Sequence, residues 1–133
     1  MEELKEIVID DVYVTPLIRA ARVLERFRKN NKTEQEKAGI IQAFEFCYEL
    51  SWKTMKRLLE KRGVIVSSPR ETFRKAAVEG LIEDPEVWFT FLQKRNIMSH
   101  VYNQEDADSV LLICPAFSDE VKKFLRTIGA PYD

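Results

Sequence analysis

The sequence predicts an all-α protein, an up-and-down four-helix bundle with one additional short helix. Only four glycines and five prolines interrupt its 133 residues, and between them apolar residues recur every three or four positions. No segment shows the alternation of a half-buried strand, so no strand is expected. Hydrophobic residues make up 45% of the chain and charged residues 32%, a balance typical of one soluble domain, expected over residues 1–133.

The first two predicted helices are long. The first runs from about Asp11 to Lys29, with aliphatic residues on one side and arginines on the other. The second begins at the cap residue Thr33 and continues to about Arg62, where Gly63 supplies a stop.

The apolar surface of the second helix is wide. Helical projection spreads it over an arc of about 200°, whereas a surface helix needs a little over 100°. Its members are Ile40, Ile41, Phe44, Cys47, Tyr48, Leu50, Trp52, Met55, Leu58 and Leu59. Two explanations stay open. Either the helix contacts both its own bundle and a partner chain, or it lies wholly inside the domain. Phe46, an apolar residue on the polar side, favours the partner chain.

A cap followed by proline predicts the short third helix. Ser68 and Pro69 open it, Glu71 occupies the capping-box position, and Gly80 closes it after Glu79.

The same signal opens the fourth helix at Asp84-Pro85, and that helix is expected to run to about Tyr102. After Asn103, an acidic stretch suits the positive end of a last helix, which Pro115 is expected to kink.

Charge and cysteine content narrow the function classes. With 21 basic and 22 acidic residues the net charge is -1, so any RNA contact must be local rather than spread over a basic face. Cys47 and Cys114 lie in apolar helical stretches without a CxxC pair or a nearby histidine, and they are expected to be buried reduced thiols. No metal or other cofactor is expected. Without a signal-peptide start or a membrane-spanning run, a cytoplasmic protein is expected.

One polar segment stands out because it holds the only histidine of the sequence, His100. Helical projection places its polar side chains on one arc of about 160°, with apolar side chains opposite. The polar residues are Arg95, Asn96, Ser99, His100, Tyr102 and Asn103. Such an arc predicts a small polar pocket.

Purely structural interpretations compete with this one. A lone histidine near a helix end is more often a cap or a packing residue, and Arg95 is able to pair with Glu86 or Asp106. Glu45 and Glu49 share a helical face with Lys53, which is typical of a solvated ion-pair row, so they are assigned no chemistry.

The spacing Arg95-x4-His100-x-Tyr102, with Asn96 directly after the arginine, resembles the Rx4-6H motif of the HEPN superfamily in its RNxxxHxY form. The resemblance extends over about residues 12 to 125 and is specific to the branch named nucleotidyltransferase substrate-binding proteins. The segments that carry it are Phe44-Glu45-Phe46, Glu49-Leu50-Ser51-Trp52-Lys53, Ser68-Pro69-Arg70, Ala76-Ala77, Gly80-Leu81-Ile82 and Trp88.

This resemblance implies a dimeric helical bundle, often encoded beside a minimal nucleotidyltransferase, the pair acting in some members as toxin and antitoxin. Toxin members are metal-independent ribonucleases, which implies catalytic roles for Arg95, Asn96 and His100. Tyr102 matches the tyrosine that the partner nucleotidyltransferase modifies with AMP.

Elementary chemistry fits these roles. Metal-free RNA cleavage needs a base for the 2'-hydroxyl proton, here His100, and a cation for the transition-state charge, here Arg95. Asn96 would orient the imidazole or hold a phosphate oxygen. The second proton-transfer group must come from another protomer, as in a homodimer, or from water. Adenylylated Tyr102 would block the cavity by bulk and charge. The alternative is a non-catalytic substrate-binding or docking subunit of the nucleotidyltransferase.

Overall fold

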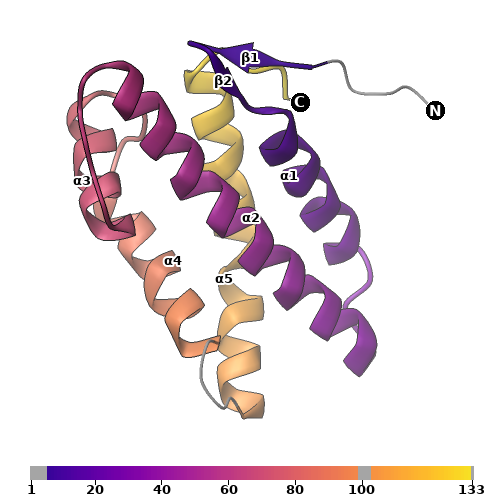
Figure 1. The fold of residues 1–133 in the computed structure, drawn as a ribbon. Helices are drawn as coiled ribbons and strands as arrows, with labels where there is room; N and C mark the ends of the chain where they lie inside the picture. Colours follow the sequence, from indigo (N-terminus) through magenta and orange to yellow (C-terminus); the bar gives the residue numbers. More distant parts are fainter. Residues whose placement is uncertain (1–5, 99–102, 133) are drawn as a thin grey trace.

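The structure, a computed structural model, describes residues 6–98 and 103–132, and within them the chain is mostly helical (Figure 1). The elements are β1 (Val8–Ile9), β2 (Val12–Tyr13), α1 (Thr15–Arg28), α2 (Glu34–Lys61), α3 (Pro69–Val78), α4 (Pro85–Met98) and α5 (Gln104–Thr127). Helices α1, α2, α4 and α5 form the bundle, and the short α3 lies between α2 and α4 in the chain, as predicted. None of the helices in the described ranges is long and apolar enough to cross a membrane.

Side-chain caps account for where three helices begin, and two of them, Thr33 and Ser68, were predicted from the sequence. Thr33 accepts a hydrogen bond from the backbone N–H of Glu36, and the Glu36 carboxylate accepts one from the backbone N–H of Thr33. Ser68 caps α3 by accepting from the backbone N–H of Glu71, and Asn103 caps α5 in the same way. These caps satisfy N–H groups that have no partner inside their own helix.

The expectation of no strand is wrong at the amino-terminal end. Ile9 pairs with Val12 across an antiparallel hairpin, and Asp10 and Asp11 take positive φ angles of 49° and 65° in its turn. The hairpin occupies the start of the predicted first helix, so α1 begins at Thr15 rather than at Asp11. Strands of two residues are too short to produce a recognisable alternation.

Helices α4 and α5 each differ from, or leave open, one expected feature. The described part of α4 ends at Met98, and the predicted end near Tyr102 lies outside the described residues. Pro115 lies inside α5, which continues through it as one helix, and the kink stays a prediction.

Helix α2 is the central helix of the bundle. It packs against α1, α3, α4 and α5, which explains most of its wide apolar surface from within one chain. Phe46, on the polar side of the helix, is not covered by these contacts, and 54% of it is exposed. Contact with a partner chain through that residue stays a prediction.

An aromatic cluster fills the core between α2, α4 and α5. The ring centroid of Phe117 lies 4.9 Å from that of Phe44, 5.1 Å from that of Phe91 and 6.0 Å from that of Trp88. Most of these rings meet edge to face, the geometry that aromatic quadrupoles favour. The cluster therefore fixes α4, which carries Arg95 and Asn96, against α2 and α5.

Native protein is expected to resist thiol modification. Cys47 and Cys114 are free and buried, and burial raises the pKa of each thiol to about 12. The reactive thiolate is therefore scarce near neutral pH. A chromogenic disulfide reagent should react with both thiols only after unfolding in guanidinium chloride. Rapid reaction of either cysteine in the native protein would contradict the packing described here.

Candidate functional site

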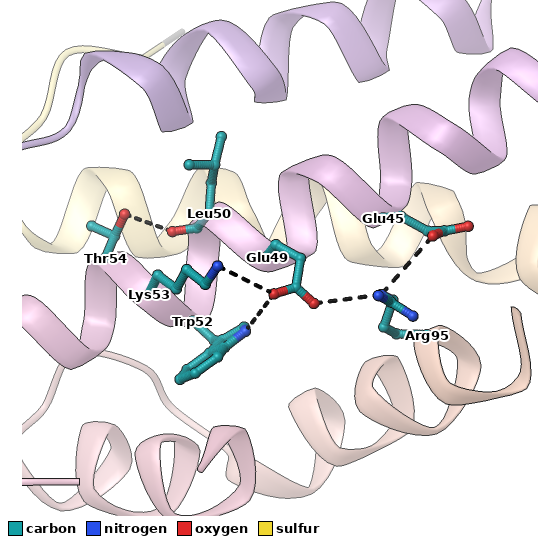
Figure 2. A network of polar contacts seen from close by, with 7 residues as sticks. All are labelled: Glu45, Glu49, Leu50, Trp52, Lys53, Thr54 and Arg95. Carbon is teal, nitrogen blue, oxygen red and sulfur yellow. Dashed lines mark hydrogen bonds and ion pairs between the residues drawn. The ribbon is translucent and has the colours of Figure 1, made fainter. Parts of the chain in front are cut away.

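Arg95 projects from the last turn of α4 toward two carboxylates on α2 (Figure 2). Its Nε lies 3.4 Å from Oε1 of Glu49 and 4.0 Å from Oε2 of Glu45. These partners differ from Glu86 and Asp106, the two acids considered from the sequence. The guanidinium is therefore held on the bundle side of α4, between two successive turns of α2.

Glu49 is itself held from two sides. Its Oε2 accepts a hydrogen bond of 3.1 Å from Nε1 of Trp52 and lies 3.8 Å from Nζ of Lys53 (Figure 2). The predicted ion pair between Glu49 and Lys53 is thus present. The same row of acids also holds Arg95, which sequence reasoning missed.

The Arg95 network is partly shielded from water. The Arg95 side chain is 26% exposed, and its Nε is fully covered without a hydrogen bond among the described residues, although both carboxylates lie within ion-pair range. Screening by solvent is weaker at such a site than at an open surface. The two glutamates therefore balance the guanidinium charge and restrict where it points.

Tyr48 lies beside this network. Its hydroxyl is buried with no hydrogen-bond partner in the described ranges. Burial raises the pKa of Tyr48, as does the charge of Glu49, whereas the charge of Arg95 lowers it. The net shift is upward, so this phenol stays protonated at neutral pH.

Asn96 has different neighbours from Arg95, because successive helical residues project about 100° apart. It is exposed and lines an open cavity of about 540 Å³ between α3 and α4, together with Arg70 and Gln93. The structure thus places Arg95 against α2 and Asn96 in this cavity.

The other predicted members of the polar arc fall into two groups. Ser99, His100 and Tyr102 lie outside the described residues. Asn103 is described, and its side chain accepts a hydrogen bond of 2.9 Å from the backbone N–H of Asp106. Its role is a helix cap rather than a wall of the predicted pocket, which corrects that expectation.

A metal ion in a protein is held by several histidine, cysteine or acidic side chains placed close together. In residues 6–98 and 103–132 no group of three or more such side chains is placed to hold one. The described residues of the polar arc are a guanidinium paired with two carboxylates and, in a separate cavity, an exposed amide.

Comparison with known proteins identifies the family. Residues 11–129 match the model of the family described as nucleotidyltransferase substrate binding protein like. A protein of Haemophilus influenzae named probable ribonuclease HepT is 42% identical over 78 residues, which cover 55% of this chain and 53% of that protein. The alignment thus spans about half the length of this curated relative.

Two solved structures share the fold. One, from Haemophilus influenzae, is described as having the fold of a substrate binding domain of a nucleotidyltransferase; it is 31% identical, with a TM-score of 0.76 over 84% of this chain and 96% of that one. The other, from Thermus thermophilus, is 24% identical, with a TM-score of 0.78 over 85% of this chain and 98% of that one. The chain therefore belongs to the family described as nucleotidyltransferase substrate binding protein like, which is the helical HEPN branch that its motif resembles.

Proposed function

We propose that this protein, one cytoplasmic domain over residues 1–133, is the partner subunit of a minimal nucleotidyltransferase and the toxin half of a toxin–antitoxin pair. Its activity is metal-independent endoribonuclease chemistry. The observation that carries the proposal is the Arg95 guanidinium, held by two carboxylates five residues before the only histidine of the sequence. The printed name of the Haemophilus relative, a probable ribonuclease, supports it.

The proposed reaction is transfer of the RNA phosphate to its own 2'-oxygen. His100 takes the 2'-hydroxyl proton, the 2'-oxygen bonds to phosphorus, and the 5'-oxygen leaves with a proton from a second group. Arg95 stabilises the extra charge on the phosphorane-like transition state, and Asn96 orients the imidazole or a phosphate oxygen. The products are a 2',3'-cyclic phosphate and a free 5'-hydroxyl.

The second proton-transfer group comes from the other protomer of a homodimer. Phe46 supports an interface, because it is 54% exposed and lines an apolar groove of about 390 Å³ between α1 and α2. The other residues of this groove are Pro16, Arg19, Ala20, Val23 and Ala43. Phe46 directly follows Glu45, but the two side chains project about 100° apart on α2, so Phe46 lies in the groove beside α1 while Glu45 faces Arg95 on α4.

Phe46→Glu is expected to convert the dimer to a monomer, because it places a charge in an apolar interface. Loss of the partner's histidine should lower RNA cleavage in the same variant. Sedimentation equilibrium gives the mass, and Leu112→Glu, at a residue 80% exposed on α5, is the matched control. A dimer that survives Phe46→Glu with full cleavage would place the interface elsewhere.

Glu49→Gln is expected to lower kcat for RNA cleavage about ten- to a hundredfold with little change in KM. The substitution keeps the size of the side chain but removes the charge that fixes Nε of Arg95, and small errors of position are costly in catalysis. The matched control is Glu60→Gln, at an exposed position of the same helix. An increase in kcat would show instead that Glu49 restrains Arg95 from acting.

The nucleotidyltransferase half of the proposal has its own test. The protein is mixed with a minimal nucleotidyltransferase encoded beside it and with ATP, and its intact mass is measured. We expect addition of AMP that Tyr102→Phe abolishes, together with loss of RNA cleavage and relief of growth arrest in cells. No addition to the wild-type protein would contradict regulation at Tyr102.

A non-catalytic docking subunit is the second candidate. The description of the Haemophilus structure as a substrate binding domain favours it, as does the exposed apolar groove at Phe46. In that case the protein would bind the nucleotidyltransferase through this groove and leave RNA intact with or without the enzyme.

A further inference from the structure

The open cavity between α3 and α4 has the size and lining of a ligand site. Its volume of about 540 Å³ falls in the range of about 300–1,000 Å³ that small-molecule sites occupy. Apolar side chains, among them Phe89 and Leu92, form part of its lining, and the polar residues Arg70, Gln93 and Asn96 line it as well.

Two arginines converge on the ring of Phe89, and one of them, Arg70, lines the cavity together with that ring. The guanidinium carbon of Arg70 lies 4.6 Å from the ring centroid of Phe89, and that of Arg74 lies 5.5 Å from it. Stacking on the ring orients both cations while leaving their N–H groups able to bind an anion. In a protein with a net charge of -1, this pair supplies the local positive charge that phosphate binding requires.

The rest of the lining suits a nucleobase. Gln93 and Asn96 are exposed amides one helical turn apart, and each carries a donor group and an acceptor group, as base edges do. Glu86 also lines the cavity, but ten residues, or about 15 Å of α4, separate it from Asn96. A base held by Gln93 and Asn96 is therefore remote from the carboxylate, whereas a phosphate at the two arginines lies one helical turn from it, because Glu86 precedes Phe89 by three residues.

We propose that this cavity binds one nucleotide of a single-stranded RNA beside the scissile phosphate. The inference rests on the proposed ribonuclease function and extends it by naming where the substrate strand is held. Single strands are the form of RNA whose bases are free to stack on aromatic or guanidinium planes. Asn96 lines the cavity and directly follows Arg95 in the chain, but the two side chains project about 100° apart, so a strand that contacts both has to turn around α4.

Binding is tested separately from cleavage with a fluorescent single-stranded oligonucleotide of 2'-O-methyl ribonucleotides, which has no 2'-hydroxyl to attack. By fluorescence anisotropy, Arg70→Ala and Arg74→Ala should each weaken binding about tenfold. Each should also reduce the slope of log affinity against log salt concentration by about one. Phe89→Leu, which keeps apolar bulk but removes the ring, should weaken binding several-fold. Arg57→Ala on α2 and Arg126→Ala on α5 are the controls, because both residues are exposed on other helices.

Wild-type affinity in an Arg70→Ala, Arg74→Ala double variant that is folded by circular dichroism would overturn the inference. Equal affinity for free AMP and for the oligonucleotide would also overturn it, since the cavity would then take a free nucleotide. Oligonucleotide binding that depends on these arginines, in a protein that never cleaves RNA, would uphold the cavity and reject the ribonuclease. Cleavage with unchanged binding and KM in the double variant would uphold the ribonuclease and reject the cavity as its RNA site.

Discussion

His100→Ala and Arg95→Ala are each expected to lower the rate of RNA cleavage by a factor of about one hundred to ten thousand. The first removes the proposed proton acceptor for the 2'-hydroxyl, and loss of general base catalysis costs about that much. The second removes the cation proposed to stabilise transition-state charge, an effect of similar size in a partly shielded site. Initial rates on a defined RNA, in the presence of a chelator, measure both.

Arg126→Ala is the control for the loss of an arginine, because Arg126 is exposed on α5. Circular dichroism of each variant excludes unfolding as the cause of lost activity. If His100→Ala cleaves at the wild-type rate, the activity comes from another group or from a contaminating nuclease, and the assignment of the base is wrong. If Arg95→Ala cleaves RNA and His100→Ala does not, the assignment of Arg95 as the stabilising cation is wrong.

Phe117→Ala is expected to lower the free energy of unfolding by about 3–5 kcal/mol, because it leaves a cavity at the centre of the aromatic cluster. Phe117 is fully buried, and its ring contacts the rings of Phe44, Phe91 and Trp88. The substitution therefore removes packing contacts that join α5 to α2 and α4. Urea unfolding followed by tryptophan fluorescence gives the value.

Leu112→Ala on the same helix is the matched control, since this leucine is 80% exposed. It should change the free energy of unfolding by less than about 0.5 kcal/mol. Similar losses of unfolding free energy in the two variants would mean that helix propensity within α5, and not packing of the aromatic cluster, determines the stability of the bundle.

Helix positions were predictable where the signal is local. Thr33 with Glu36, and Ser68 with Glu71, form caps within four residues of sequence, so the starts of α2 and α3 agree with the structure to within a residue. The hairpin at Asp10 and Asp11 was missed because its strands are shorter than any periodicity that a window detects.

The contacts of the candidate site were less predictable because they depend on tertiary packing. The arginine and the amide were found from their spacing to His100, but the partners of Arg95 on α2 lie more than forty residues away in the chain. Glu45 and Glu49, one helical turn apart, were a usable signal, yet the nearby Lys53 suggested solvation instead. For Asn103, the sequence already held a usable signal, because an asparagine followed three positions later by the acidic Asp106 is typical of a helix cap.

The most direct measurement is incubation of total RNA with the purified wild-type protein, free of any partner and in the presence of a chelator, followed by analysis of the new ends. The account predicts cleavage that leaves 2',3'-cyclic phosphates and that His100→Ala abolishes. Intact RNA after incubation with the wild-type protein would contradict the ribonuclease and leave the docking subunit as the function of this fold.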